Sequence, residues 1–250
     1  MKQKISKWAF RIIVTMLFIA GILFVIILNP ILTYANKTVH NQYAIYHHKA
    51  LNAEILIKLD QATTLLKSSE LYNPELHLDI CLNDGSIYPK LIQILRGNAF
   101  GWGFYNKVVL QGNIHNNYVE LNGYKWNFSQ LLAHEMTHCL QFNSLGLWKS
   151  KPISAIPNWK WEGYAEFISR QNEDQKDLSV NIERLLASHK NSWEISFTDN
   201  SIAPREYYEY WLLVQYCMNI KKKTFQQILK DTTSEQTIRQ EMMKWQLGNK

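Results

Sequence analysis

The chain has 250 residues, of which 46% are hydrophobic and 13% aromatic, enough to supply a folded core and a membrane segment. The formal net charge of +6 is concentrated near the N-terminus, because four basic residues and no acidic residue precede residue 33. The rest of the chain carries about +2, an ordinary charge that does not indicate a nucleic-acid partner. The run Lys221–Lys223 is predicted to be a solvated helix end.

Residues 9–32 are predicted to form a transmembrane signal-anchor helix. The stretch from Ile12 to Leu28 is uncharged, and apolar residues flank it on both sides. About 20 apolar residues suffice to cross the hydrocarbon core of a bilayer. Basic flanks stay in the cytoplasm, so residues 1–8 are expected to form a cytoplasmic tail. The chain is then a single-pass protein of the cell membrane with its larger part outside the cytoplasm.

A cleaved signal peptide is the competing interpretation of this segment. Such a peptide would have a shorter apolar region and small residues before the cleavage site. The sequence Thr33-Tyr34-Ala35 matches such a site poorly. We therefore favour the uncleaved anchor.

Residues 33–70 are interpreted as a helical linker and the first helix of the ectodomain, since apolar residues such as Leu51, Ile55 and Leu59 recur at helical spacing. His47 and His48 are expected at its surface. The remaining residues, 71–250, form the main domain. Alternation predicts strands at 76–82, 107–111 and 118–121, with a short helix over 88–95. Three glycines between residues 97 and 103 are interpreted as chain breaks.

From Asn127 onward the pattern is mostly helical. Asn127 and Gln130 resemble a capping box at the start of a helix that continues to Phe142. Residues 144–158 are predicted to form a loop. Further helices are expected at 160–171, 178–189, 205–220 and 224–245. Strands followed by helices indicate an α+β domain.

The three cysteines, Cys81, Cys139 and Cys217, are widely spaced. This spacing is typical neither of a disulfide framework nor of a paired-cysteine metal site. One disulfide outside the cytoplasm and three buried, reduced side chains remain alternatives.

The strongest functional signal is an H-E-x-x-H sequence at His134–His138. Positions four apart project from the same face of a helix, so both imidazoles can bind one Zn²⁺. Glu135 lies at the flank of that face, where its carboxylate can approach a zinc-bound water.

A catalytic zinc needs a third protein ligand and an open position for water. Gln141 and Ser144 occupy the positions where a metzincin has glycine and histidine, which excludes that class. The next candidate is Glu162, which begins a helix after a proline-containing loop. Gly163 and Ala165 are small and are expected to let this helix approach the first one closely.

Residues Leu132–His138 and Trp161–Glu166 together resemble the gluzincin pattern, closest to the thermolysin-like peptidase MA group, whose helices read HE(L/M)TH and EGxAE. The resemblance implies a zincin-like domain that binds one Zn²⁺, with Glu162 as the third ligand. It also implies that Glu166 orients a ligand histidine. A surface salt bridge is the alternative role for Glu166.

The same family often supplies an oxyanion donor from a later helix. Tyr207 has the best spacing for this role among the aromatic residues at 205–211. A packing role is the alternative for Tyr207, as for any single tyrosine there.

These residues predict a membrane-anchored zinc metallopeptidase. Zinc would lower the pKa of its bound water, and Glu135 would take the proton as that water attacks a scissile carbonyl. Zinc and Tyr207 would stabilise the oxyanion. A peptide or protein substrate is expected to pair with the strand at Val108–Leu110, which resembles the zincin edge strand.

Two non-catalytic alternatives remain. The first is a zinc-bound anchored ectodomain that binds a partner without turnover, and the intact Glu135 argues against it. The second is a purely structural membrane protein, which leaves the two histidines and their acidic partners unexplained.

Overall fold

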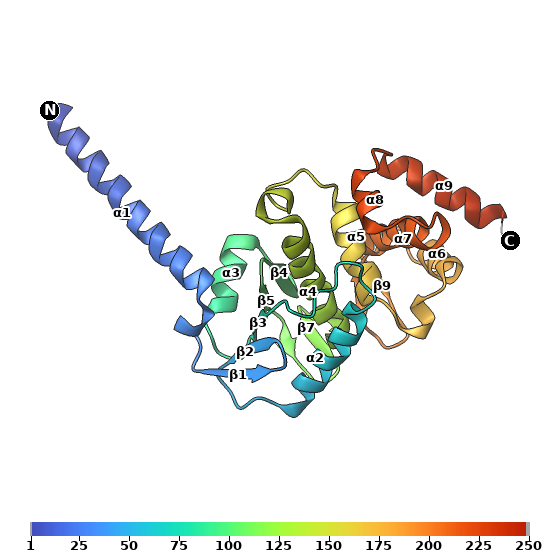
Figure 1. Ribbon diagram of the computed structural model, residues 1–250, viewed down its shortest axis with the longest axis horizontal. Helices are drawn as coiled ribbons and strands as arrows, with labels where there is room; N and C mark the ends of the chain where they lie inside the picture. The colour runs from blue at the N-terminus through green and yellow to red at the C-terminus, as the bar shows by residue number, and fades with distance from the viewer. Residues whose placement is uncertain (1, 249–250) are drawn as a thin grey trace.

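The computed structural model describes residues 2–248, with side chains from residue 7 onward. One long helix projects from a mixed domain in which a central sheet lies beside a group of helices (Figure 1). The expected α+β class is confirmed. Met1 and the side chains of the predicted cytoplasmic tail up to Ser6 lie outside the described part of the chain.

The projecting helix α1 runs from Lys2 to Leu28. Its segment Lys7–Leu28 is long and apolar enough to cross a membrane, and the window that meets this test is not buried by the domain. The helix ends four residues earlier than the predicted span, because Pro30 begins a separate 3-10 turn, η1 (Pro30–Leu32).

The helical interpretation of residues 33–70 is wrong in its first part. A hairpin of β1 (Asn36–His40) and β2 (Tyr43–His47) precedes α2 (Ala53–Leu66). Aromatic and β-branched residues favour strands here, and Asn41 adopts the left-handed φ of +52° in the two-residue turn. Helical periodicity therefore applies only from about residue 51 onward.

His47 is buried, which corrects the expected surface position. Its ring contacts the Thr38 hydroxyl at 2.8 Å and the Lys49 carbonyl at 2.7 Å. These contacts satisfy both ring nitrogens inside the hairpin. The neighbouring His48 is half-buried.

The central sheet has the strand order β1-β2-β3-β5-β4. Strands β2, β3 (Leu78–Cys81) and β5 (Lys107–Leu110) run parallel, whereas β4 (Gly101–Phe104) is antiparallel to β5 at the edge. The strand at Val108–Leu110 is therefore internal, and the prediction that it forms the edge is wrong. Gly101 and Gly103, which were interpreted as chain breaks, lie in this edge strand. Gly97 does interrupt the chain, because it ends α3.

Alternation along these strands divides the interior into two cores. One face of the sheet packs against α2 and α4 (Phe128–Leu145), and the other packs against α3 (Tyr88–Arg96) and the end of α1. The side chains that face α2 and α4 include Ile45, Ile80 and Val108. Their sequence neighbours on the opposite face are Tyr46, Cys81 and Val109. This period of two is what a sheet covered on both faces requires.

The remaining strands form two small sheets. One contains β6 (Asn113–Ile114), β7 (Tyr118–Leu121) and β8 (Tyr124–Asn127), and the other pairs β9 (Glu194–Ser196) with β10 (Ile202–Pro204).

The helices after the sheets follow the predicted order with shifted ends. Two long predicted helices are interrupted: 205–220 changes to a π-helical turn at Tyr216, and 224–245 is two helices. The elements are η2 (Leu147–Lys149), α5 (Asn158–Ser169), η3 (Glu173–Gln175), α6 (Leu178–Ala187), α7 (Arg205–Gln215), η4 (Tyr216–Ile220), α8 (Phe225–Lys230) and α9 (Glu235–Gly248).

Asn127 caps α4 as predicted, because its side chain accepts a hydrogen bond from the backbone N–H of Gln130. The reciprocal half of the capping box is replaced by a tertiary contact. The Gln130 amide donates to Gln175 at 2.7 Å, so it ties α4 to η3.

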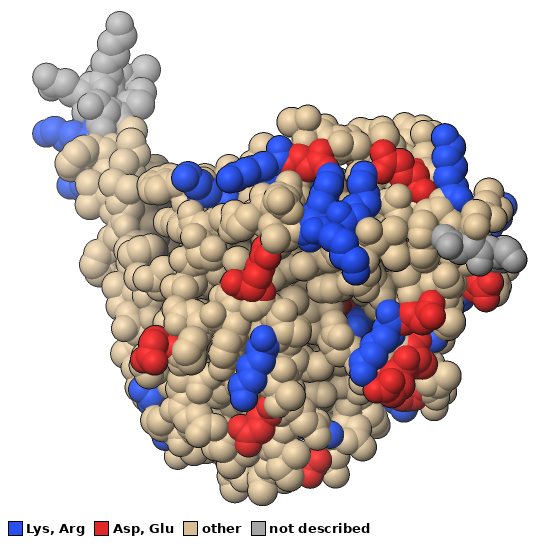
Figure 2. Space-filling view, turned by 45° about the vertical axis from the view of Figure 1, so that its right-hand side comes forward, with Lys and Arg blue, Asp and Glu red and all other residues tan. Residues whose placement is uncertain are grey.

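All three cysteines are free and buried, which favours the interpretation as small apolar side chains. Lys221 and Lys223 pair with Glu241 and Asp231, respectively. Figure 2 likewise shows acidic side chains interspersed among the basic ones on the face that it presents.

Gly163 serves a different contact from the one expected. A Cβ atom at this position would lie 2.4 Å from the Tyr210 carbonyl oxygen and 2.9 Å from a Val214 methyl group. Both atoms belong to α7, so Gly163 lets α5 approach α7 rather than α4. The close α5–α7 contact fixes the helix that carries Glu162.

We expect Gly163→Ala to lower the free energy of unfolding by about 1–3 kcal/mol, because the added methyl group forces the two backbones apart. Denaturant unfolding monitored by circular dichroism measures this. Gln240→Ala on the exposed side of α9 is the control, with an expected change within about 0.5 kcal/mol. Equal stability of the two variants would contradict a tight α5–α7 contact.

Candidate metal centre

Two helices bring three ligand-type side chains together. His134 and His138 come from α4, and Glu162 comes from the first turns of α5. The two Nε2 atoms lie 3.2 Å apart. A Glu162 carboxylate oxygen lies 3.5 Å from the Nε2 of His134 and 3.2 Å from that of His138. These three residues form a group that could hold a metal ion.

The size of this triangle fits a small cation. In a tetrahedral centre with bonds of about 2.0–2.1 Å, neighbouring ligand atoms lie about 3.3–3.4 Å apart. The observed separations of 3.2–3.5 Å bracket that spacing. The three side chains therefore need little rearrangement to bind one ion together.

The outer nitrogens of both histidines face fixed hydrogen-bond acceptors. The Nδ1–H of His138 donates to the Gln141 side-chain oxygen at 2.8 Å, and the Gln141 amide donates to the Trp161 carbonyl at 3.0 Å. The Nδ1 of His134 lies 3.4 Å from a Glu166 carboxylate oxygen. Acceptors at Nδ1 hold the proton there and leave the Nε2 lone pairs directed at the centre of the cluster, where a metal ion could bind.

Glu166 is fully buried, which contradicts the alternative of a surface salt bridge. Its second carboxylate oxygen pairs with the buried guanidinium of Arg170, one turn further along α5. Arg170 lies in turn over the Trp126 ring, 5.1 Å from its centroid. A buried carboxylate without such a partner would be costly, so Arg170 keeps Glu166 ionised beside His134.

The charges of the cluster favour a positive charge at its centre. Burial lowers the pKa of His134, but contacts with Glu162 and Glu166 outweigh it and raise that pKa to about 10. Burial raises the pKa of Glu162, but His138 and His134 outweigh it and hold that pKa well below its usual range. A shared metal ion would supply the positive charge while both imidazoles stay neutral.

Glu135 lies on the flank of the cluster against the edge strand. A Cβ atom on Gly103 would lie 2.0 Å from the Glu135 carbonyl oxygen, and one on Gly101 would lie 3.0 Å from the Glu135 side chain. Only glycines allow β4 to pass this close. Burial raises the pKa of the Glu135 carboxyl, although the two histidines and a backbone hydrogen bond from Gly103 oppose the rise.

Tyr207, from α7, lies in the same cleft beside His134. Its ring is parallel to that of His134, with the centroids 6.1 Å apart. Burial and the nearby carboxylates of Glu162 and Glu135 raise the pKa of its hydroxyl, which therefore stays protonated. The structure thus places this hydroxyl-bearing ring beside the three ligand side chains.

A cleft of about 620 Å³ gives access to the cluster. Aromatic side chains make up a third of its lining residues, as in sites that enclose an organic ligand, and the edge strand β4 forms one side. It contains all the predicted catalytic and ligand residues, and Glu166 lies behind them. The aromatic side chains that line it are Phe100, Trp102, Tyr124, Trp126, Phe142, Trp161, Trp193 and Tyr207.

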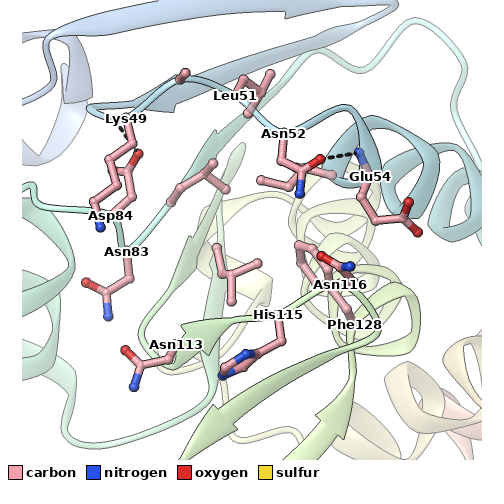
Figure 3. A pocket seen from close by; sticks show the side chains of 14 residues that line it. Lys49, Leu51, Asn52, Glu54, Asn83, Asp84, Asn113, His115, Asn116 and Phe128 are labelled. Carbon is pink, nitrogen blue, oxygen red and sulfur yellow. Dashed lines mark hydrogen bonds between the residues drawn. The ribbon is translucent and has the colours of Figure 1, made fainter.

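A second cavity, of about 360 Å³, lies between the start of α2 and the β6 segment (Figure 3). Two acidic residues line it, Glu54 and Asp84. Asp84 accepts hydrogen bonds from the backbone N–H groups of His48 and Lys49 at 2.8 and 3.0 Å. These contacts close the loop after β2. The ring of His115, also at this cavity, stacks on Tyr118 with the centroids 4.6 Å apart.

Sequence reasoning missed Gln141, Arg170 and the glycines of β4. The three-residue spacing from His138 to Gln141 and the four-residue spacing from Glu166 to Arg170 place each pair on one helix face, and this signal could have found them. The contact between β4 and Glu135 has no local signal, because it joins segments distant in the sequence.

No protein-family model and no curated protein matches this chain. The resemblance to gluzincins therefore rests on the two helices that carry the cluster.

We expect Gln141→Met to weaken metal binding by about 10- to 100-fold, because it removes the acceptor that orients His138 while keeping the side-chain volume. Competition with a chromogenic chelator measures the affinity. The matched control is Gln246→Met, a buried glutamine on α9 outside the cleft. Unchanged affinity in Gln141→Met would show that Gln141 does not position a ligand.

Proposed function

We propose that this protein is a membrane-anchored zinc metallopeptidase of the gluzincin type. The observation that carries the proposal is the convergence of His134, His138 and Glu162 at one end of an aromatic cleft, with Glu135 beside them. Two imidazoles and one carboxylate are a ligand set that catalytic zinc uses, and a fourth position stays free for water or substrate. The α+β architecture is compatible with a zincin-like fold.

Zinc bound here would supply a Lewis acid that polarises a carbonyl group and makes a water molecule more acidic. The chain's own residues supply the rest. Glu135 accepts a proton from the attacking water and passes it to the leaving amine, as a general base and then a general acid. Its raised pKa suits a group that must gain and lose a proton near neutral pH.

The edge strand β4 is the proposed binding surface for the substrate, in place of the internal strand β5. It pairs with β5 on one side only, and three of its residues line the cleft. An extended peptide can add to such an edge through backbone hydrogen bonds, which gives affinity with limited dependence on sequence. Aromatic side chains around the cleft would then select the side chains of the substrate.

Tyr207 and Glu166 complete the proposed site. The protonated Tyr207 hydroxyl would donate a hydrogen bond to the oxyanion that forms from the scissile carbonyl. Glu166 would hold the ring of His134 in its ligand orientation.

The helix α1 is proposed to remain as a membrane anchor, with its basic N-terminal flank in the cytoplasm and the cleft on the opposite side.

The second candidate function is a zinc-bound ectodomain that binds a partner without turnover. The buried position of Glu135 beside the ligands favours the peptidase.

We expect the wild-type protein to contain about one zinc per chain and His138→Ala to contain none, because three protein ligands are needed to hold the ion. Metal analysis of the detergent-purified chain measures this. Equal zinc content in both proteins would overturn the ligand assignment.

We expect Glu135→Gln to lower peptide hydrolysis by about a hundred- to ten-thousand-fold while zinc content and fold stay unchanged, because glutamine cannot act as a general base. A mixed peptide library, read by mass spectrometry with and without chelator, provides the substrate. Glu162→Gln is the matched variant, in which zinc binding itself weakens. Wild-type turnover in Glu135→Gln would refute the mechanism, and a zinc-loaded wild type without any substrate would favour the partner-binding alternative.

We expect the mature protein to retain residues 9–32. N-terminal sequencing of the membrane-extracted chain measures this, and a first residue before residue 9 is expected. A mature start near Asn36 would identify the segment as a cleaved signal peptide.

A further inference from the structure

The end of α1 is part of the folded domain. Ile26 and Ile27 pack against the core on the second face of the sheet, which includes Tyr88 and Ile92 of α3. The Tyr88 hydroxyl donates a hydrogen bond to the Ile27 carbonyl at 2.7 Å. Between residues 7 and 28, side chains are partly covered only at Leu23, Ile26 and Ile27. Helix α3 therefore lies beside the last two turns of the apolar segment.

Those two turns coincide with one surface of the bilayer. The apolar segment has 22 residues, which span about 33 Å at a rise of 1.5 Å per residue. The hydrocarbon core of a bilayer is about 30 Å thick. Once α1 crosses the membrane, its last turns reach the boundary between the hydrocarbon and the headgroups, and α3 reaches the same level.

The outer face of α3 is apolar at this level. Ile87, Leu91, Ile94 and Leu95 follow one another at helical spacing, and the Ile94 side chain is 73% exposed. Within the described part of the chain, Ile87, Ile94 and Leu95 are exposed and Leu91 is half-buried. The position of this stripe directly beside α1 identifies lipid as the material that would cover it.

A second apolar segment lies across the cleft from α3. The turn after α4 exposes Leu147, Trp148 and Ile153, with Trp148 exposed to 78%. Lys151 and Pro152 of this turn line the same cleft as Arg96 at the end of α3. Figure 1 shows the C-terminal end of α4 above α3 and β4, on the upper side of the domain, where the free end of α1 also lies. Tryptophan is enriched at membrane interfaces.

The charges of the two segments match a bilayer surface. Residues 86–104 and 143–158 contain no acidic residue. Their four basic residues are Lys90, Arg96, Lys149 and Lys151. Basic side chains beside an apolar face are attracted to anionic headgroups and keep their charge in the headgroup layer.

We propose that α3 and the turn at residues 147–153, here called the cleft rim, insert into the interfacial layer of the bilayer that α1 crosses. The cleft then opens at the membrane surface. Under the proposed peptidase function, its substrates are extended protein segments that emerge from the same bilayer. The inference rests on the proposed membrane anchor for its geometry and on the proposed peptidase only for this substrate class.

Depth-dependent fluorescence of the full chain in vesicles of phosphatidylcholine and phosphatidylglycerol tests the proposal. Ile94→Cys and Trp148→Cys introduce labelling sites for an environment-sensitive fluorophore, and the native cysteines are buried and protected. Ile19→Cys in α1 reports the anchor. Ile57→Cys in α2 and Leu186→Cys in α6 are exposed controls away from the rim. Circular dichroism verifies that each labelled protein is folded.

Lipids with nitroxide groups on their acyl chains should quench the fluorophores at residues 94 and 148 and at residue 19, but not those at residues 57 and 186. The emission at the two rim positions should also shift to the blue. Quenching at residue 19 with none at residues 94 and 148 overturns this proposal and leaves the anchor intact. Quenching at only one of residues 94 and 148 overturns the proposal that both α3 and the turn at residues 147–153 insert. Absence of quenching at residue 19 overturns the anchor and the rim together. None of these readouts uses zinc or hydrolysis, so failure of the peptidase proposal is detected separately.

Discussion

The arrangement of the site depends on one buried electrostatic contact between α4 and α5. Two imidazole nitrogens and a carboxylate oxygen converge at 3.2–3.5 Å, where a positive charge is required to hold them together. The outer sides of the same imidazoles face Gln141 and Glu166, and Arg170 neutralises the latter. Contacts therefore run from the Arg170 guanidinium through the Glu166 carboxylate and the His134 ring to the centre of the cluster. Their order fixes which nitrogens can receive a metal ion.

Close backbone contacts make this arrangement rigid. Gly163 lets α5 lie against α7, and Gly103 lets β4 lie against the backbone of α4 at Glu135. The first contact orients Glu162 toward the histidines, and the second forms the wall along which an extended chain can pair. Both positions carry no side chain, because any Cβ atom would enter a neighbouring backbone. Packing of this kind tolerates little change in volume.

The end of α1 joins this apolar N-terminal helix to the central sheet of the domain. The second face of the sheet is covered by α3 and by Ile26 and Ile27 at the end of α1, so the apolar core of the domain continues into this helix. Under the proposed membrane anchor, this junction would set the orientation of the cleft relative to the bilayer.

The sequence by itself determined the α+β class, the apolar N-terminal segment and the residues of the cluster, because helical spacing places His134 and His138 on one face and the start of the next helix supplies Glu162. Only the tertiary structure decided that residues 36–47 form a hairpin in the main sheet, that β4 and not β5 is the edge strand, and that Gly163 contacts α7. Each of these features depends on contacts between backbone segments that are distant in the sequence. Neither periodicity nor composition encodes such long-range contacts. The local sequence pattern thus specifies which side chains lie on the same face of a helix or strand. Long-range packing decides which other element that face contacts.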